Sequence, residues 1–299
     1  MTDSVSPAVR RQLLDANPAL SRFRPLSRII AFDDFSKGMN GWTGLVGNYE
    51  DTLDNILPEF QPMYPPQLSV ANQWDAGSHG AVNGSYSLKI ATRPQPGALN
   101  MVLKRLTFIE PGPIQVEMMF AVKPEASELL LSDTDFRSFG IILDLQDPDG
   151  AGAPRRAMPH IKYLNASEAG RRETWQYKSQ VEQGNSVGST GATRSHPHFV
   201  DDGWQDIPGG GQRLCYNELP TKLNWHYLRL GVDLRTMRVT ALQCNGRRLP
   251  VESIETMVMP AWPNLWSMLN ICLFCESNSD KRCFLFVDSV LVSGDWVDA

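Results

Sequence analysis

Three carboxylates that alternate with apolar residues are the first side chains in this chain that point to chemistry. Glu117, Asp144 and Asp233 each lie in a segment whose apolar residues recur at every second position, as in residues 114–122. Successive side chains of a β-strand point to opposite faces. The apolar set needs the core, so we expect the carboxylates to point away from it. Two carboxylates that meet in a pocket can act as general acid and general base.

Other polar and aromatic side chains follow the same alternation and would complete a site for a sugar. His160 is a candidate proton shuttle or metal ligand, and Lys162 and Arg229 are candidates for binding substrate. Trp175 and Tyr177 offer aromatic planes, which stack on the C–H faces of sugars while charged groups bond the hydroxyls. The alternative is a solvated sheet face, on which none of these side chains binds a ligand.

One long segment without periodicity, residues 180–213, is the candidate cover for such a site. It is rich in Gly and Ser and contains Trp204, a further candidate for binding substrate. A stretch of this length without a pattern is usually functional or mobile. A surface loop with no role is the alternative.

Short strands are the elements that must position these side chains. The runs with strand texture are residues 28–32, 87–92, 100–108, 114–122, 139–145, 160–164, 174–179, 227–234, 238–244, 269–276 and 283–292. Many short strands with turn residues between them indicate a sandwich. We therefore predict an all-β fold, an antiparallel β-sandwich formed by residues 28–299.

The one helix expected lies at residues 6–23, within an N-terminal helical arm that spans residues 1–27. Ser6 can cap this helix and Pro7 suits its first position. An amphipathic arm of this kind can pack on its own domain or on a second copy of the chain. The sequence leaves both arrangements open.

Composition excludes several classes of partner. The chain has 28 Lys and Arg against 33 Asp and Glu, a net charge of −5, and no long basic cluster, so we expect no nucleic acid partner. No apolar run reaches the roughly 18 residues of a membrane span. The first residues lack a charged segment followed by an apolar one, so we expect a cytoplasmic protein.

Four short segments together resemble one protein superfamily. They are Phe-Asp-Asp-Phe-Ser-Lys-Gly at 32–38, Gly-Ser-Tyr-Ser-Leu-Lys-Ile at 84–90, Asn-Trp-His-Tyr-Leu-Arg-Leu at 224–230 and Phe-Leu-Phe-Val-Asp-Ser-Val at 284–290. The pattern is similar to the concanavalin A-like lectin and glucanase superfamily. This resemblance implies a jelly-roll sandwich and, for the function, a saccharide ligand.

The resemblance also implies a structural calcium ion. Members of the superfamily often hold calcium with an acidic pair of the first strand and an Asp of the last strand. The matching positions here are Asp33, Asp34 and Asp288. The Glu-x-Asp-x-x-Glu strand of the glucanases and the Arg/Gln/His and Tyr motifs of alginate lyases are absent, so no catalytic residue carries over.

We therefore predict a carbohydrate-active protein that binds a saccharide on the concave face of one sheet. If it is an enzyme, it would be a glycoside hydrolase or a lyase that acts through paired carboxylates. The alternatives are a non-catalytic module that binds a saccharide or a protein, and a structural homo-oligomer held by the arm.

Overall fold

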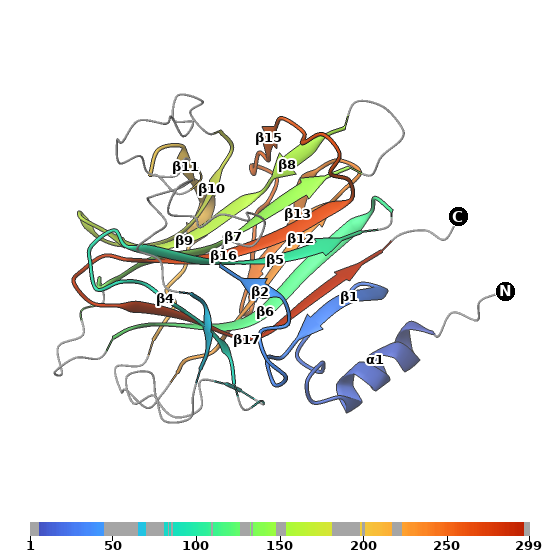
Figure 1. Cartoon of the computed structure of the whole chain (residues 1–299), viewed down its shortest axis with the longest axis horizontal. Coiled ribbons are helices and arrows are strands. Elements are labelled where there is room, and N and C mark those ends of the chain that lie inside the picture. The colour runs from blue at the N-terminus through green and yellow to red at the C-terminus, as the bar shows by residue number, and fades with distance from the viewer. Residues whose placement is uncertain are drawn as a thin grey trace.

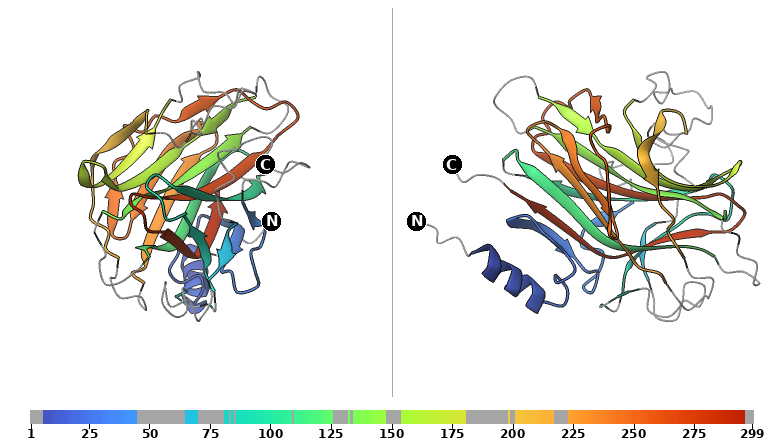
Figure 2. Two further views of the ribbon diagram at one scale, coloured as in Figure 1. Left: turned by 60° about the vertical axis from the view of Figure 1, so that its left-hand side comes forward. Right: turned by 180° about the vertical axis from the view of Figure 1, so that it is seen from behind.

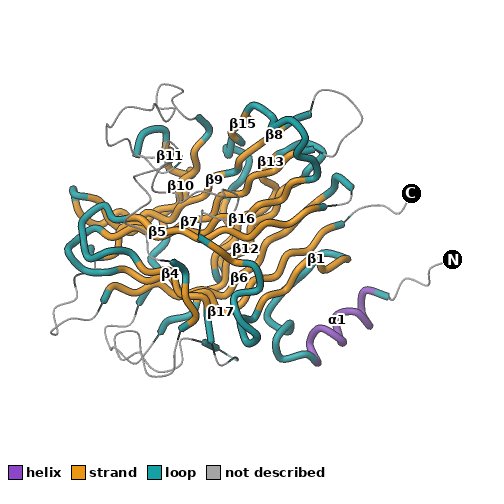
Figure 3. Tube along the Cα trace, viewed as in Figure 1, coloured by secondary structure: helices purple, strands orange, loops and turns teal. Residues whose placement is uncertain are grey.

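Two antiparallel sheets packed face to face form the molecule (Figure 1). The computed structural model describes residues 6–44, 65–69, 81–82, 84, 86–108, 110–125, 132, 134–147, 154–180, 198, 201–216 and 223–295. Within these residues strands dominate, and one helix lies near the N-terminus (Figure 3). The predicted fold class, a jelly-roll β-sandwich with an N-terminal helical arm, is confirmed.

Sheet A has eight strands in the described part of the chain. Their order is β14-β13-β12-β6-β17-β4-β3, and β1 also pairs with β17. The bounds are β1 (Arg28–Asp33), β3 (Gln67–Leu68), β4 (Leu88–Ala91), β6 (Pro113–Pro124), β12 (His226–Asp233), β13 (Arg238–Cys244), β14 (Arg247–Leu249) and β17 (Cys283–Gly294). Strand β17 lies inside this sheet and is antiparallel to β6, β4 and β1, so the first and last strands are neighbours, as the sequence predicts.

Sheet B has nine strands within the same described residues. Their order is β11-β10-β9-β7-β16-β5-β2, and β8 joins β7 to β15. The bounds are β2 (Trp42–Thr43), β5 (Leu99–Thr107), β7 (Phe136–Gln146), β8 (Arg156–Met158), β9 (His160–Ser167), β10 (Gly170–Lys178), β11 (Trp204–Gly211), β15 (Met257–Met259) and β16 (Met268–Ser277). Strand β11 corrects the prediction of an irregular loop at 180–213, because the Gly-rich segment 204–211 pairs with β10.

Aromatic side chains fill the core between the two sheets. The ring of Phe139 lies 4.6 Å from that of Phe120, 5.6 Å from that of Tyr163 and 5.7 Å from that of Trp175, centroid to centroid. Phe120 comes from sheet A and the other three from sheet B. Each such ring buries roughly 150–250 Å², so this cluster is a principal attachment between the sheets.

The N-terminal arm packs on the outer face of sheet A, the face turned away from the core. Helix α1 (Pro7–Ala16) lies beside β1 and on the same side of the molecule as β17 (Figure 2). Behind the helix, Phe23 is fully buried and its ring contacts that of Phe32 edge to face. The arm therefore folds on its own domain, one of the two arrangements that the sequence leaves open.

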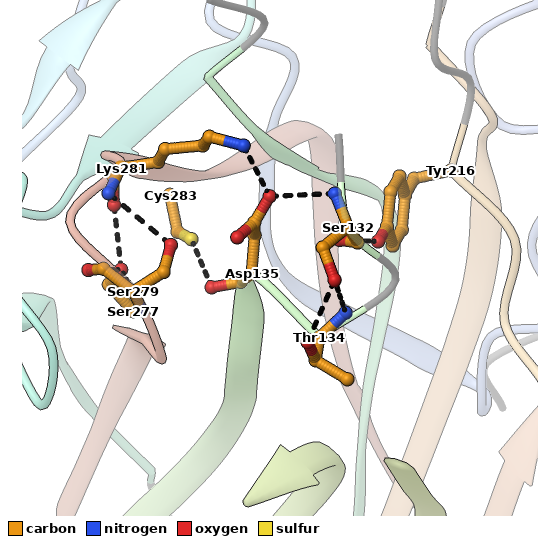
Figure 4. A network of polar contacts seen from close by, with 8 residues as sticks. All are labelled: Ser132, Thr134, Asp135, Tyr216, Ser277, Ser279, Lys281 and Cys283. Atoms are coloured by element: carbon orange, nitrogen blue, oxygen red, sulfur yellow. Dashed lines mark hydrogen bonds and ion pairs between the residues drawn. The ribbon is translucent and has the colours of Figure 1, made fainter. Parts of the chain in front are cut away.

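A polar network joins the connection between β16 and β17, which passes from sheet B to sheet A, to the segment that precedes β7 (Figure 4). The Asp135 carboxylate accepts a hydrogen bond from Ser132 N and pairs with Lys281 Nζ, each at 2.8 Å. The Tyr216 hydroxyl donates to Ser132 O, and the Cys283 thiol to Asp135 O. These contacts fix one end of the sandwich.

Candidate functional site

The outer face of sheet B carries the main cluster of chemically competent side chains in the described residues. Pairing of neighbouring strands sets this cluster, because residues opposite each other share a face. Lys178 of β10 lies opposite His160 of β9 and opposite Trp204 of β11. Lys162, two residues after His160, faces the same side. With His198 and Asp201 of the covering segment these residues form what we call the lysine site.

Two lysine ammonium groups converge on one indole at this site. Nζ of Lys162 lies 4.3 Å from the centroid of the Trp204 ring, and Nζ of Lys178 lies 5.5 Å from it. Both lysines are only 1% exposed. A cation over an aromatic face is attracted by the ring quadrupole, and more so when both are withdrawn from water. The Trp204 ring thus partly replaces the hydration that the two cations lose.

The turn before β11 holds Trp204 in place above the lysines. Trp204 N donates to Asp201 O across this turn, and Gly203 has φ +81°, a backbone conformation that side chains disfavour. A Cβ at Gly203 would lie 2.9 Å from Gln180 O and 3.1 Å from Cε of Lys178. Glycine is therefore required here for the turn and for its close approach to the lysine.

Burial lowers the pKa of both lysines. The pKa of Lys178 falls from 10.5 to about 8, first through desolvation and then through the nearby charge of Lys162. Desolvation is also the main reason why the pKa of Lys162 is lowered. Asp201 and Glu276 act in the opposite direction at both lysines, since their negative charges favour the ammonium form. A neutral amine at Lys178 is thus accessible near neutral pH.

A histidine pair borders the lysines. The rings of His160 and His198 are stacked at 5.1 Å, and Nε2 of His160 lies 3.0 Å from Nδ1 of His198. Nδ1 of His160 lies 2.6 Å from Met158 O, an atom that only accepts, so this nitrogen carries the proton. In the neutral pair, His198 Nδ1 therefore donates to His160 Nε2.

Two polar groups of the site are incompletely satisfied within the described part of the chain: the indole N–H of Trp204 and the ammonium group of Lys162 in its contact with Asp201. Nε1 of Trp204 is buried and has no hydrogen-bond partner among the described residues. A buried donor without an acceptor costs about 1–3 kcal/mol. The distance from Lys162 Nζ to the Asp201 carboxylate is 3.9 Å, too long for a hydrogen bond, and that carboxylate is bonded instead to Arg137.

Trp175 and Tyr177 correct the predicted site, because they point into the core. Trp175 is fully buried, its Nε1 donates to the Gln212 side chain at 2.9 Å, and the Tyr177 hydroxyl donates to Gln205 at 3.1 Å. The alternation of β10 places these two rings on one face, as the sequence predicts, but that face is the inner one. Their polar tips find partners in the 205–212 segment, which allows the rings to be buried.

Glu117 and Arg229 lie on the other sheet, under the N-terminal arm. Oε1 of Glu117 accepts hydrogen bonds from Arg24 N at 2.7 Å and from the Tyr227 hydroxyl, and Oε2 accepts from Gln115 Nε2 at 2.8 Å. Arg229 lies opposite Glu117 in the register of β12 and β6. Glu117 is fully buried and anchors the arm, so the structure does not bring it to the lysine site.

The remaining predicted acid/base candidates also lie apart from one another. Asp144 is on the outer face of sheet B, but its two oxygens pair with Arg156 at 2.7 and 2.8 Å. Asp233 ends β12 of sheet A and accepts a hydrogen bond from Arg235 N at 2.9 Å in the following turn. The predicted carboxylate pair is therefore not assembled from Glu117, Asp144 and Asp233.

The surroundings of the three predicted calcium ligands do not fit a calcium ion. Asp33 accepts a hydrogen bond from Trp42 Nε1 at 2.8 Å and pairs with Lys104 Nζ at 3.1 Å. Arg22 lies 3.7 Å from Asp288. The remaining ligand, Asp34, caps the turn at Ser36. Two of the three carboxylates thus face cations of the protein, and no group of three His, Cys, Asp or Glu side chains suited to a metal occurs in the described residues.

Three of the predicted residues, His160, Lys162 and Trp204, do meet at the lysine site. Sequence reasoning missed Lys178, whose alternation with Trp175 and Tyr177 is visible in the sequence. It also missed Glu276 of β16, which accepts a hydrogen bond from Ser138 of β7 on this face. The pairing of β9 with β10, which places Lys178 opposite His160, leaves no comparable pattern in the sequence.

The chain belongs to the family described as "Domain of unknown function (DUF6772)", whose model matches residues 10–296. No curated protein matches the chain. No helix among the described residues is long and apolar enough to cross a membrane.

Among the solved structures of similar overall shape are a carbohydrate esterase, an alginate lyase and a carbohydrate recognition domain. A carbohydrate esterase from the Shiga toxin-encoding bacteriophage phi24B has 10% identity and a TM-score of 0.42, over 90% of this chain and 99% of that one. A mutant of the alginate lyase Aly36B, in complex with an alginate tetrasaccharide, has 10% identity and a TM-score of 0.39, over 88% and 100% of the two chains.

A third similar structure is the carbohydrate recognition domain of Emp46p in its potassium-bound form. It has 9% identity and a TM-score of 0.36, over 86% of this chain and 99% of that domain. At these values the likeness assigns no activity to the present chain.

Proposed function

We propose that the chain binds an acidic saccharide at the lysine site, on the outer face of sheet B. The observation that carries this proposal is the convergence of Lys162 and Lys178 on the Trp204 ring, at 4.3 and 5.5 Å. A uronate carboxylate or a sulfate ester supplies the negative charge that two withdrawn ammonium groups favour. Sugar rings supply the C–H faces that stack on aromatic planes, and hydroxyls that accept from a buried indole N–H.

A ligand would displace the Asp201 carboxylate from its contact with Lys162. Its side chain is 65% exposed, and its long contact with Lys162 is worth little in water. An anionic ligand that enters beside Trp204 gains the lysine charges and gives Trp204 Nε1 an acceptor. Asp201 keeps its bond to Arg137 in this arrangement.

A lyase reaction on a uronate is the second candidate, and the lowered pKa of Lys178 favours it. A general base works best when its pKa lies near the working pH, and that of Lys178 is about 8. In such a reaction neutral Lys178 takes the proton from the carbon beside the carboxyl group. The glycosidic C–O bond breaks as the carbon–carbon double bond forms, and the leaving oxygen takes a proton from the His160–His198 pair.

Binding to defined polysaccharides tests the proposal. The probes are polygalacturonate, alginate and heparin as acidic chains, with xylan and mixed-linkage glucan as neutral ones. We expect the wild type to bind at least one acidic chain, less strongly at high salt. Lys162→Met and Lys178→Met should each weaken that binding at least tenfold, while Lys37→Met at an exposed position should not.

The result that contradicts the proposal is equal binding by the wild type and both lysine variants, or binding of neutral chains alone.

For the lyase candidate, the bound acidic chain is incubated with the wild type and the ultraviolet absorbance of the new double bond is followed. Binding without any rise in absorbance leaves a non-catalytic saccharide-binding module.

A further inference from the structure

A short segment after β15 exposes two tryptophans. Trp262 is 54% exposed, Trp266 is 46% exposed, and Leu265 between them is 47% exposed. Large apolar side chains are usually withdrawn from water, and an exposed group of them marks a binding surface. We call this segment, residues 260–267, the tryptophan ledge.

A fully buried glutamine holds the backbone of the ledge. The Gln146 side chain donates to Trp262 O at 2.8 Å and to Leu265 O, and it accepts from Trp262 N at 2.8 Å. Ser267 N donates to Asp147 O at 3.1 Å at the end of the ledge. The two tryptophans are therefore presented on a fixed support, which lowers the entropy lost when a ligand binds.

Charged side chains support the ring of Trp262. The Arg156 guanidinium lies 5.4 Å from the centroid of this ring, and its Nε and Nη2 pair with the two oxygens of Asp144. A planar guanidinium stacked on an indole fixes the orientation of the ring. The ledge thus places an aromatic plane next to donors and acceptors, which is the combination that sugars require.

The ledge lies on the same sheet face as the lysine site. Strand β7 carries Asp144, Ile142 and Gly140 on this face, and Gly140 lies opposite Lys162 in the register with β9. Asp144 lies four residue steps along the strand from Gly140, a span of about 13 Å. The apolar side chains of Ile142 and Met158 lie between the two ends. In Figure 1, β11 and β15 both lie on the side of β7 away from β17.

We propose that Trp262 and Trp266 form a second binding subsite for the saccharide that the lysine site holds. This inference rests on the proposed function. The lysines would bind the charged group of one sugar unit, and the indoles would stack on a unit further along the chain. A ligand with several sugar units would engage both subsites, while a short one would occupy the lysine site alone.

The size of the ledge favours a saccharide over a protein partner. Three half-exposed side chains offer roughly 300 Å², since a large aromatic residue buries roughly 150–250 Å² in full. A stable protein interface buries about 800 Å² on each partner. One or two sugar rings match the smaller area.

Binding of long and short forms of one polysaccharide tests the inference. The acidic chain bound by the wild type is compared with its disaccharide, for Trp262→Ala, Trp266→Ala and the double variant. We expect the double variant to bind the long chain at least tenfold less tightly and the disaccharide as the wild type does. Val258→Ala is the matched control, because Val258 is an apolar residue of β15 that is 77% exposed and lies outside the ledge, and this variant should bind both ligands normally.

The outcomes separate this inference from the proposed function. If the lysine variants lose the long chain and the tryptophan variants keep it, the ledge inference is wrong and the lysine site stands. A wild type that binds no acidic chain overturns both. Light scattering of each protein completes the test, because a dimer that disappears in the double variant would make the ledge a contact between copies of the chain and overturn the inference.

Discussion

Lys178→Met should stabilise the protein while it weakens saccharide binding. The lysine is 1% exposed, and its pKa falls from 10.5 in the unfolded chain to about 8 in the folded one. At 1.36 kcal/mol for each pKa unit, keeping this ammonium charged in the folded state costs about 3 kcal/mol. Methionine retains most of the apolar stem and removes the charge. A residue that lowers stability at a binding site is the pattern expected where function and stability compete.

The stability difference between the wild type and Lys178→Met should depend on pH in a defined direction. Between pH 8 and about 10.5 the unfolded state holds the Lys178 proton and the folded state has released it. The contribution of Lys178 to the free energy of unfolding of the wild type therefore increases as pH rises through that window. The advantage of Lys178→Met should be largest below pH 8 and should shrink by about 3 kcal/mol by pH 10.5.

Urea denaturation of both proteins at pH 7, 8, 9 and 10 measures the difference. Other groups also contribute in this range, such as Cys244, whose pKa burial raises from 9.0 to about 12, so that its thiol ionises in the unfolded chain but not in the folded one. Groups that do not interact with Lys178 affect the wild type and the variant alike, so the difference between the two curves reports Lys178 together with Lys162, whose charge interacts with it. A difference that stays constant with pH, or a variant that is less stable at pH 7, would refute the reasoning.

Three further predictions concern the core ring Trp175, the arm anchor Glu117 and the exposed helix residue Leu13. Trp175→Ala should lower the free energy of unfolding by about 3–5 kcal/mol in urea, because the indole is core; wild-type stability would place the ring elsewhere. Glu117→Ala should speed tryptic cleavage after Arg22 without changing saccharide binding, because the carboxylate anchors the arm; an unchanged rate would assign the anchoring to other contacts. Leu13 is 64% exposed on α1, so Leu13→Asp should reduce the mass in light scattering if the arm joins two copies, and equal masses would end the homo-oligomer hypothesis.

Alternation of apolar residues predicted the strands well because the inner faces of both sheets need a continuous apolar surface. It also identified residues that point away from the core. Glu117 and His160 both do so, as expected. Alternation cannot say, however, to which sheet a strand belongs. Glu117 lies on the outer face of sheet A and His160 on that of sheet B, on opposite sides of the sandwich.

Residues that are both aromatic and polar led to the wrong prediction of which face of β10 is buried. In β10 one face carries Trp175 and Tyr177 and the other carries Gln176 and Lys178. Either face can be the inner one from the sequence alone, since an indole N–H or a phenol needs only one partner to be buried. Gln212 and Gln205 provide those partners from a distant segment. Long-range contacts of this kind leave no local pattern.

The place of β17 within sheet A has a consequence for the synthesis of the protein. Ribosomes make β1, β4 and β6 first, but the strand that hydrogen-bonds to all three is β17. About 170 residues separate the end of β6 from the end of β17. At 5–20 residues per second, translation takes roughly 10 to 30 seconds over that distance. During this time the nascent chain carries unpaired strand edges of the kind that aggregate. Sheet A can therefore close only after β17 has left the ribosome, and a premature stop before residue 283 would remove the shared partner of three strands.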